Sequence, residues 1–455
     1  MPDSVTEVMQ AIGVQELTNH HPAMHILLIR LCFTIGNFLF NNYVAGYVIY
    51  MILQILFACF TFSYAIYYMA KKKVRLPYRI ITLLFFMFCP ILTLYNTTLL
   101  KDVPFALCIL LYTIFYVEMT NNTEEFAKKK SRWVLLALII LGVLFFRNNG
   151  IYVIILSLPF LLWLARKHYK PILVVFILTI GIYKIITGPV YDYCGIKQGS
   201  TREALSIPLQ QFARISKYKQ DSLTQEEKEK IYQYLPVENI GELYHPLSSD
   251  PVKGNFSEEG FEQDKLGLVK LYLKLALKYP GQTIYSFVNN SYGYYYPDTI
   301  GWGITYGINQ QEFQNSRSEN FGLDRNPIIE IKAIDQIHDF INQRDIPLIS
   351  MIASAGFYFW LMCIAIGYCI YQRKYKLLLG YLPMLVIWLT CLASPVFCEN
   401  RYIYSLFVSL PTLLSFAIMN IEKKEDEKEI INVAKTDKNK KDIVKSYMKN
   451  NEKEH

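Results

Sequence analysis

Three of the seven histidines lie within six positions, in the stretch "LTNHHPAMHILLIR" at residues 17–30, which opens an apolar run. Histidine transfers protons, binds phosphate and ligates metal ions, so His20, His21 and His25 can do chemistry. One interpretation is structural: His20 caps a helix that has Pro22 in its first turn, and His21 is hydrogen-bonded at a wet interface. The alternatives are contact of His20 and His21 with a phosphate or sugar, and metal ligation. Adjacent positions on a helix point apart, which disfavours the metal. We expect His25 only to pack.

Other side chains that can do chemistry lie in short polar segments beside apolar runs. Carboxylates can act as a general base or hold a divalent cation, whereas lysine and arginine fit the oxygens of a phosphate. If the apolar runs are membrane spans, a single charged residue at the end of one is often only an anchor. Several such residues at the same depth in the membrane fit chemistry on a phosphate-bearing lipid. The set comprises Asp3 in "MPDSV", Lys101 and Asp102 in "LLKDVPF", Arg147 in "FFRNNG", and Glu399 and Arg401 in "CENRY".

The elements that must position these side chains are membrane-spanning helices. Hydrophobic residues make up 53% of the 455-residue chain, and repeated apolar runs approach or exceed the ~20 residues that a helix needs to cross a bilayer. Backbone that crosses lipid must hydrogen-bond internally, as a helix does, so we predict an all-α polytopic membrane protein. The clearest runs are 43–69, 80–100, 103–119, 133–146, 151–165, 172–190, 349–371, 377–397 and 402–421.

Positive charge alternates along the chain and predicts the topology. Four short loops are rich in lysine and arginine, and the loops that alternate with them hold one basic residue each, namely Lys101, Arg147 and Arg401. Because positive charge near helix ends stays cytoplasmic, we place the basic loops inside and the others, with the histidines, on the extracytoplasmic side of a cell membrane. The net charge of +8 then reflects these loops and anionic lipids, and it does not indicate a nucleic-acid partner. The basic loops are "KKKVRLPYR" at 71–79, "KKKSR" at 128–132, "RKHYK" at 166–170 and "QRKYK" at 372–376.

This topology divides the chain into five parts. We expect the apolar stretch 24–40 to lie in the outer interface, because a crossing there would invert every later loop and would bury Arg30 in lipid. The parts are an extracytoplasmic loop with an interfacial helix (1–42), a bundle of about six spans (43–190), an extracytoplasmic domain (191–347), three further spans (348–421) and a charged cytoplasmic tail (422–455).

Three stretches of the extracytoplasmic domain carry a pattern. "SLTQEEKEKIYQYL" predicts a short surface helix with Ser222 as its N-cap. In "SFVNNSYGYYYPDTIGWG" the tyrosines can stack on sugar rings, but packing or an interfacial belt is the more common role. "DKLGLVKLYLKLALKYPGQ" predicts an amphipathic helix suited to the membrane surface or to the underside of a lid. We expect its leucines near one face and its lysines opposite, namely Leu266, Leu268, Leu271, Leu275 and Leu277 against Lys270, Lys274 and Lys278.

Several of these motifs together resemble a known superfamily. In chain order, "PDS", "NHHP", "LLKDV" and "FRNNG" resemble the multi-spanning GT-C glycosyltransferases of bacterial envelopes. "SIPLQQFARI", "SSDPVK", "YYYPD" and "SPVFCENRY" are similar to a largely uncharacterised Gram-positive branch of that superfamily. The resemblance covers nearly the whole chain. It implies a GT-C-like helical bundle that transfers a sugar from a polyprenyl-phosphate donor to an envelope glycan or lipid acceptor on the outer face of the membrane.

The resemblance also implies roles for single residues. In GT-C enzymes an acidic residue of the first outer loop serves as base or metal ligand, and that role falls on Asp3. The acid of the second outer loop corresponds to Asp102, so both are candidate ligands of Mg²⁺ or Mn²⁺. Arg147 and Arg401 are candidates for the donor phosphate. Of the remaining candidates for substrate contact, we place His20 and His21 at the lip of the donor groove, and the others are Lys101 and Glu399.

Three other function classes compete with sugar transfer. A transporter or flippase of lipid-linked sugars would place ionisable residues near the bilayer midplane, whereas these apolar runs are nearly free of charge. A polysaccharide polymerase would use the same donor class and the same face. A non-catalytic scaffold fits one departure from the GT-C pattern, in which a span ends just before the first-loop acid, whereas Met1 lies two residues ahead of Asp3. We expect the natural gene to encode a hydrophobic segment upstream of Met1, without which the 455-residue form is weak or inactive.

Overall fold

The computed structural model describes residues 2–299, 336 and 350–419, and within these ranges the chain is helical without a β-strand. Five of its helices are long and apolar enough to cross a membrane, and several shorter apolar helices accompany them. The prediction of an all-α chain with membrane-spanning helices is therefore confirmed at this level. The tail at 422–455 and much of 300–347 lie outside the described residues.

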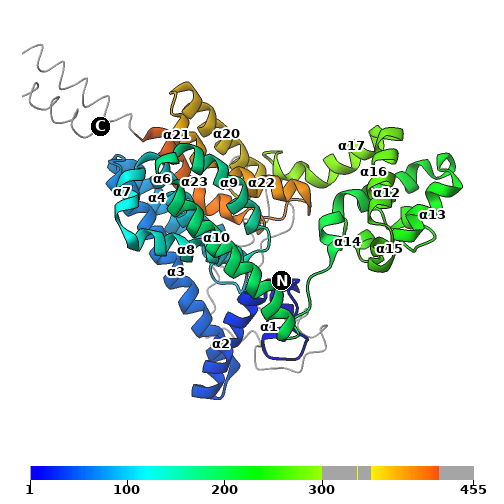
Figure 1. The fold of residues 1–455 in the computed structure, drawn as a ribbon, viewed down its shortest axis with the longest axis horizontal. Coiled ribbons are helices and arrows are strands. Elements are labelled where there is room, and N and C mark those ends of the chain that lie inside the picture. The colour runs from blue at the N-terminus through cyan, green and yellow to red at the C-terminus, as the bar shows by residue number, and fades with distance from the viewer. Residues whose placement is uncertain (1, 300–335, 337–349, 420–455) are drawn as a thin grey trace, which may run out of the picture.

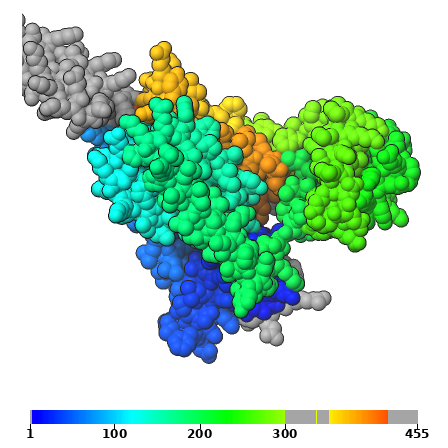
Figure 2. Space-filling model, in the orientation of Figure 1, coloured from blue at the N-terminus to red at the C-terminus, as the bar shows by residue number. Residues whose placement is uncertain are grey.

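The helices form three groups (Figure 1). At the N-terminus lie α1 (Pro2–Ala11) and α2 (Ala23–Phe40). The bundle contains α3 (Tyr43–Lys71), α4 (Leu76–Phe88), α5 (Pro90–Tyr95), α6 (Asp102–Asn121), α7 (Thr123–Lys128), α8 (Lys130–Phe146), α9 (Gly150–Leu164), α10 (Tyr169–Ile185), α20 (Ala355–Tyr371), α21 (Tyr375–Leu378), α22 (Leu382–Ala393) and α23 (Tyr404–Ile418). After α11 (Tyr191–Tyr193), a separate lobe beside the bundle holds α12 (Ser206–Lys219), α13 (Gln225–Tyr234), α14 (Asp250–Lys253), α15 (Glu258–Gln263), α16 (Lys265–Lys278) and α17 (Pro280–Ser291) (Figure 2).

Helix α6 is the centre of the bundle. Its residues from Asp102 to Thr120 are all buried, and it packs against α3, α8 and α23. A helix that is apolar on every side has no face to present to water, so neighbouring helices cover it completely. Its two ends therefore define the two ends of the bundle.

One predicted span is wrong as a continuous helix. The run 80–100 is divided at Pro90 into α4 and α5, and 96–100 is not helical. Proline has no backbone N–H and its ring clashes with the preceding turn, so a helix tends to break there. The break has a consequence for the site: the free carbonyls of Asn96 and Thr98 accept hydrogen bonds from Gln54 of α3 at 2.9 and 3.0 Å. This anchors the segment that leads directly into Lys101.

Helices α2 and α3 form a hairpin that projects from the bundle (Figure 1). They approach so closely that a Cβ on Gly36 would stand 2.1 Å from the backbone nitrogen of Gly46. Arg30, in the middle of α2, donates hydrogen bonds to the carbonyls of Gln10 and Ala11 at 2.8 and 2.9 Å. A cation at the negative end of the α1 dipole is stabilising, so Arg30 fastens α1 to α2. Helix α2 is long and apolar enough to span a membrane, and its interfacial position stays a prediction.

The basic loops gather at one end of the bundle. Lys71 and Lys72 pair with Glu118 in the last turn of α6, at 3.0 and 2.8 Å. Lys167 lies 3.7 Å from Glu124 of α7, the helix that directly follows α6. Lys374 donates hydrogen bonds to carbonyls at the end of α23. The candidate site residues surround the start of α6. The basic loops and the candidate site therefore lie at opposite ends of the bundle.

The α12–α17 lobe has its own hydrophobic core. Thr224 is the N-cap of α13 and forms a capping box with Glu227, so the expectation for Ser222 is wrong by two residues. The expected single leucine face of α16 is also wrong. Three leucines point into the core, whereas others are exposed on the opposite side. The buried ones are Leu268, Leu271 and Leu275, and the exposed ones include Leu266 and Leu277.

Candidate functional site

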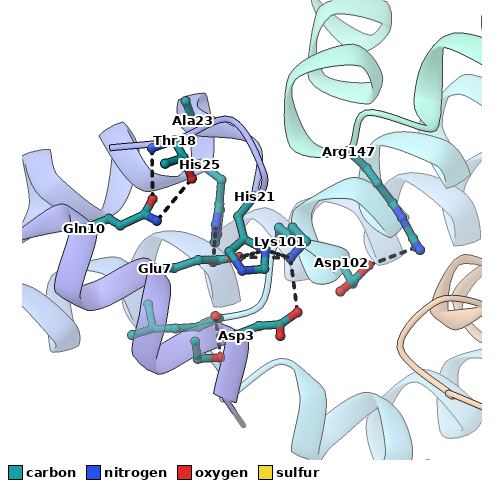
Figure 3. A network of polar contacts seen from close by, with 12 residues as sticks. Asp3, Glu7, Gln10, Thr18, His21, Ala23, His25, Lys101, Asp102 and Arg147 are labelled. Atoms are coloured by element: carbon teal, nitrogen blue, oxygen red, sulfur yellow. Dashed lines mark hydrogen bonds and ion pairs between the residues drawn. The ribbon is translucent and has the colours of Figure 1, made fainter. Parts of the chain in front are cut away.

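Helix α1 presents two carboxylates toward the start of α6. Asp3 and Glu7 are four residues apart, so they lie on the same face of the helix, one turn apart. Ser4 donates a hydrogen bond to the carbonyl of Leu99 at 2.9 Å and holds α1 against the segment that precedes α6. Figure 3 shows both carboxylates directed toward Lys101.

Lys101 is the centre of the cluster. Its Nζ lies 3.1 Å from Glu7 Oε1, 3.5 Å from Asp3 Oδ2 and 2.8 Å from His21 Nδ1 (Figure 3). An ammonium group has three hydrogens to donate, and three acceptors from two segments take them. Since Lys101 is largely buried, its charge depends on these partners.

Behind Lys101, a chain of polar contacts holds Glu7 from the other side. The Tyr50 hydroxyl donates a hydrogen bond to Gln54 Oε1 at 3.1 Å. Its oxygen therefore accepts the hydrogen bond from His25 Nε2, at 2.7 Å. His25 Nδ1 lies 2.8 Å from Glu7 Oε2, a carboxylate that only accepts. Both ring nitrogens of His25 therefore face acceptors. The expectation that His25 only packs is wrong, because this fully buried ring braces Glu7.

The neighbouring histidines differ in position. The side chain of Asn19, and not that of His20, accepts a hydrogen bond from the first backbone N–H of α2, at Ala23. The capping role expected for His20 is therefore wrong. His20 is exposed, whereas His21 is buried and accepts from Lys101. The two rings meet edge to face at 4.8 Å, which sets His20 at the rim of the cluster.

A second ion pair lies next to the first. Asp102, the first residue of α6, pairs with Arg147 at 2.9 Å (Figure 3). A carboxylate at a helix N-terminus is favoured by the helix dipole, and its guanidinium partner compensates its burial. Arg147 also donates to the carbonyl of Tyr402 at 3.1 Å, and its guanidinium carbon lies 4.7 Å from the centre of the Tyr402 ring.

The loop before α23 supplies the third part of the cluster. Arg401 pairs with Asp3 and lies 3.6 Å from Glu399, and its guanidinium lies over the same Tyr402 ring, at 5.0 Å. This loop is held by the aromatic segment after α17. The buried Tyr294 donates to the carbonyl of Val396, which supports packing as the role of this tyrosine.

Exposure separates the four carboxylates. The side chains of Asp3 and Glu399 are 23% and 14% exposed, whereas those of Glu7 and Asp102 are 0% and 1% exposed. Asp3 and Glu399 are therefore partly open to solvent, whereas Glu7 and Asp102 are covered and contact cations of the cluster. This division cannot be read from the sequence, where Asp3 and Asp102 are equivalent candidates.

Burial and charge shift the pKa values in different directions. Burial raises the pKa of Asp3 and of Glu7, but nearby groups lower it by more. At Asp3 these groups are Lys101 and Arg401, and at Glu7 they are Lys101 and His25. The pKa of Asp3 therefore stays well below its usual range, and that of Glu7 falls to about 2. Burial, with the charge of Lys101, lowers the pKa of His21 to about 4.

Glu399 and Lys101 shift the other way. Burial raises the pKa of Glu399 against the opposing charge of Arg401. Burial disfavours the charge on Lys101, but Glu7 and Asp3 outweigh it and raise its pKa. The cluster thus contains carboxylates of unequal basicity beside permanently charged cations.

The structure brings together every predicted site residue, from five segments of the chain. Sequence analysis missed Glu7, Tyr50, Gln54 and Tyr402. For Glu7 a signal exists, since "PDSVTEV" places a second acid one helical turn after Asp3. For Tyr50 and Gln54 the i, i+4 spacing inside an apolar helix is a weaker signal, and for Tyr402 there is none.

The side chains do not fit a divalent cation as they stand. Within the part of the chain that the structure describes, no group of three or more His, Cys, Asp or Glu side chains is placed to hold a metal ion. Asp3 contacts Lys101 and Arg401, and Asp102 contacts Arg147. Cations of the chain therefore stand where Mg²⁺ or Mn²⁺ would bind. The metal role of Asp3 and Asp102 stays a prediction.

Comparison with known proteins identifies the family but no activity. No curated protein and no solved structure matches this chain. A family model for a family of unknown function, DUF6020, matches residues 13–432, which leaves only α1 of the described helices ahead of the match. Because the match spans nearly the whole sequence, the chain belongs to the DUF6020 family.

Proposed function

We propose that this protein is a membrane glycosyltransferase that moves a sugar from a polyprenyl-phosphate donor to a cell-envelope acceptor on the outer face of the membrane. The observation that carries the proposal is the arrangement around Tyr402. Arg147 and Arg401 lie over its ring, and both surface-reaching carboxylates, Asp3 and Glu399, contact or adjoin Arg401. Phosphate-binding cations and a proton acceptor within one cluster are what this reaction requires.

The reaction assigns each group a task. The acceptor hydroxyl attacks the anomeric carbon, the bond from that carbon to the phosphate oxygen breaks, and the hydroxyl proton passes to a carboxylate. Arg401, Arg147 and Lys101 stabilise the negative charge that grows on the leaving polyprenyl phosphate. Asp3 takes the proton.

Substrate binding adjusts Asp3 for this role. Without substrate, Lys101 and Arg401 hold its pKa well below the usual range, and such a carboxylate is a weak base. A donor phosphate beside the same cations adds negative charge near Asp3 and competes for their hydrogen bonds. Both effects raise the pKa of Asp3. Asp3 thus becomes a better proton acceptor when the donor is in place.

The buried groups explain why the cluster needs so many charges. Glu7 and Asp102 are too deeply buried to meet a substrate, but each holds a largely buried cation of the cluster in place, Lys101 and Arg147 respectively. The sidedness follows from charge. The basic loops lie at the end of α6 opposite the cluster. If those loops are cytoplasmic, the cluster faces the outer side of the membrane.

The direct test is to incubate membranes containing the protein with radiolabelled polyprenyl-phosphate sugars and to follow label in envelope glycan and lipid. We expect transfer by the wild type and a loss of about a hundredfold or more in Asp3→Asn, which keeps the shape but cannot accept the proton. The matched control is Glu16→Gln, since Glu16 belongs to the same N-terminal segment but forms an exposed pair with Lys197. It should retain full transfer.

Two results would overturn parts of this proposal. Full transfer by Asp3→Asn, with loss in Glu399→Gln, would move the base to Glu399, whose raised pKa suits it. Label that crosses the membrane unchanged on its polyprenyl carrier, without transfer, would show a transporter of lipid-linked sugars.

A further inference from the structure

Helix α16 has two apolar faces where a helix of a water-soluble domain needs only one. The first face, with Leu268, Leu271 and Leu275, fills the core of the α12–α17 lobe. The second lies on the opposite side of the helix and is exposed, with Leu277 at 83%. It consists of Leu266, Val269, Leu273 and Leu277, spaced so that they form one stripe along the helix.

The next helix, α17, has its polarity inverted. It exposes Ile284 and Tyr285, both at 61%, together with Val288. On its inner side it buries Ser286, Asn290 and Ser291 instead. Exposing apolar side chains while burying polar ones is unfavourable in water, but it is the arrangement expected where the outer environment is lipid.

Helix α17 links the lobe to the bundle. The helix runs from the lobe back to the bundle, where the residues directly after it, Tyr292–Tyr294, pack against α20 (Figure 1). There Trp360 Nε1 donates to the carbonyl of Tyr295 at 2.8 Å, which joins the end of this segment to α20. Further along α20, Ile364 is exposed on the outside of the bundle.

Charge along α16 fits the same environment. Lys265 and Lys270 are exposed at the two margins of the leucine stripe. Lysines beside an apolar stripe are typical of helices that lie in the head-group region, because the ammonium groups meet anionic lipids while the leucines enter the acyl boundary. A partner protein would match the apolar stripe equally well. The inverted polarity of α17 and its continuity with the bundle favour lipid.

We propose that the exposed faces of α16 and α17 rest on the surface of the bilayer that the bundle crosses. The α12–α17 lobe is then held against the membrane by a second, independent contact in addition to its covalent connections. This inference does not depend on the proposed sugar transfer, since it concerns only where the lobe sits.

Fluorescence quenching by labelled lipids tests this placement in the intact protein. Single cysteines replace Leu273 or Leu277 in a chain in which the accessible Cys59, Cys194 and Cys363 are serine, and each carries a bimane label. The protein is reconstituted in vesicles of phosphatidylcholine and phosphatidylglycerol with a nitroxide near the head-group end of the acyl chain.

We expect about a twofold loss of fluorescence at positions 273 and 277, as for a label at Ile364 of α20. A label at Tyr232 of α13, in the same lobe and also exposed, should keep its fluorescence. Fluorescence at positions 273 and 277 as high as at 232, with quenching intact at 364, would overturn the proposal. Quenching at all four positions would overturn it too, because the lobe would then have no defined lipid-facing side.

Discussion

The two ends of α6 each hold a carboxylate paired with cations, yet they are built differently. At the start, Asp102 is buried with Arg147 and adjoins the cluster around Lys101. At the other end, Glu118 meets Lys71 and Lys72, side chains that are 36% and 18% exposed. The helix dipole favours Asp102 and disfavours Glu118, so Glu118 depends on its lysines.

This difference separates two uses of charge in one protein. The basic end uses partly exposed lysines from short loops, which suits a position at a membrane surface and costs little to rearrange. The cluster end draws side chains from α1, α2, α6, the α8–α9 loop and the loop before α23 into a partly buried network. A buried network is costly unless every partner is present, so its assembly indicates a function beyond anchoring.

The largest expected effect is all-or-none. It concerns the side of the membrane on which the cluster end and the basic end of the bundle lie. A cysteine at Glu238, exposed in the lobe, should react with a membrane-impermeant maleimide in intact cells, whereas a cysteine at Lys167 should react only after lysis. The accessible Cys59, Cys194 and Cys363 are replaced by serine beforehand. Labelling of position 167 in intact cells would reverse the orientation.

The next effect compares the two carboxylates of α6 in the transfer assay. We expect Asp102→Asn to lose about a hundredfold in rate, with a raised KM for the donor, because Arg147 is no longer held in place. Glu118→Gln should stay within about twofold of the wild type, because Glu118 and its lysines lie at the other end of the same helix, away from the cluster. Equal losses in both variants would mean that the effect is on folding.

The third effect is on stability and contrasts two lysines. Lys101→Met leaves Glu7 buried without its lysine, which should cost about 3–5 kcal/mol in the free energy of unfolding. Lys71→Met should cost about 1 kcal/mol or less, since Lys72 still pairs with Glu118. Thermal unfolding in detergent measures both. If the Glu7→Gln/Lys101→Met double variant is no more stable than Lys101→Met alone, the buried-charge explanation is wrong.

The smallest effect is a pH dependence confined to the cluster end. His21 is held neutral, with its pKa lowered from 6.5 to about 4, so the unfolded chain binds more protons between these values. Stability should therefore fall as the pH drops from 6.5 to about 4, by on the order of 2 kcal/mol. The pKa of Glu7 is lowered from 4.5 to about 2, so stability should continue to fall as the pH drops below 4.5. In His21→Gln the upper part of the profile should be flat, and an unchanged slope there would refute this role.

Part of the site was predictable because local spacing carries it. The i, i+4 pair of Asp3 and Glu7 shares one helix face, and Lys101 and Asp102 sit at the start of a long apolar helix, where an outward-facing end was expected. The break at Pro90 was also readable, but hydropathy averaged over the run 80–100 concealed it. The N-cap of α13 was misplaced because Ser222 and Thr224 both match the capping-box pattern, with Gln225 and Glu227 three residues later, and only the folded helix shows that Thr224 is the cap.

By itself the sequence determined the helical class, the two ends of the bundle and the list of charged candidates, because hydropathy, proline and lysine act over a few neighbouring residues. Only the tertiary structure decided which acid is exposed, that His25 braces Glu7, and that α16 points half of its leucines outward. These outcomes depend on partners far away in the chain, such as Asp3 with Arg401 and Glu7 with Lys101. Burial and pairing are properties of the packed chain, and no local pattern encodes them.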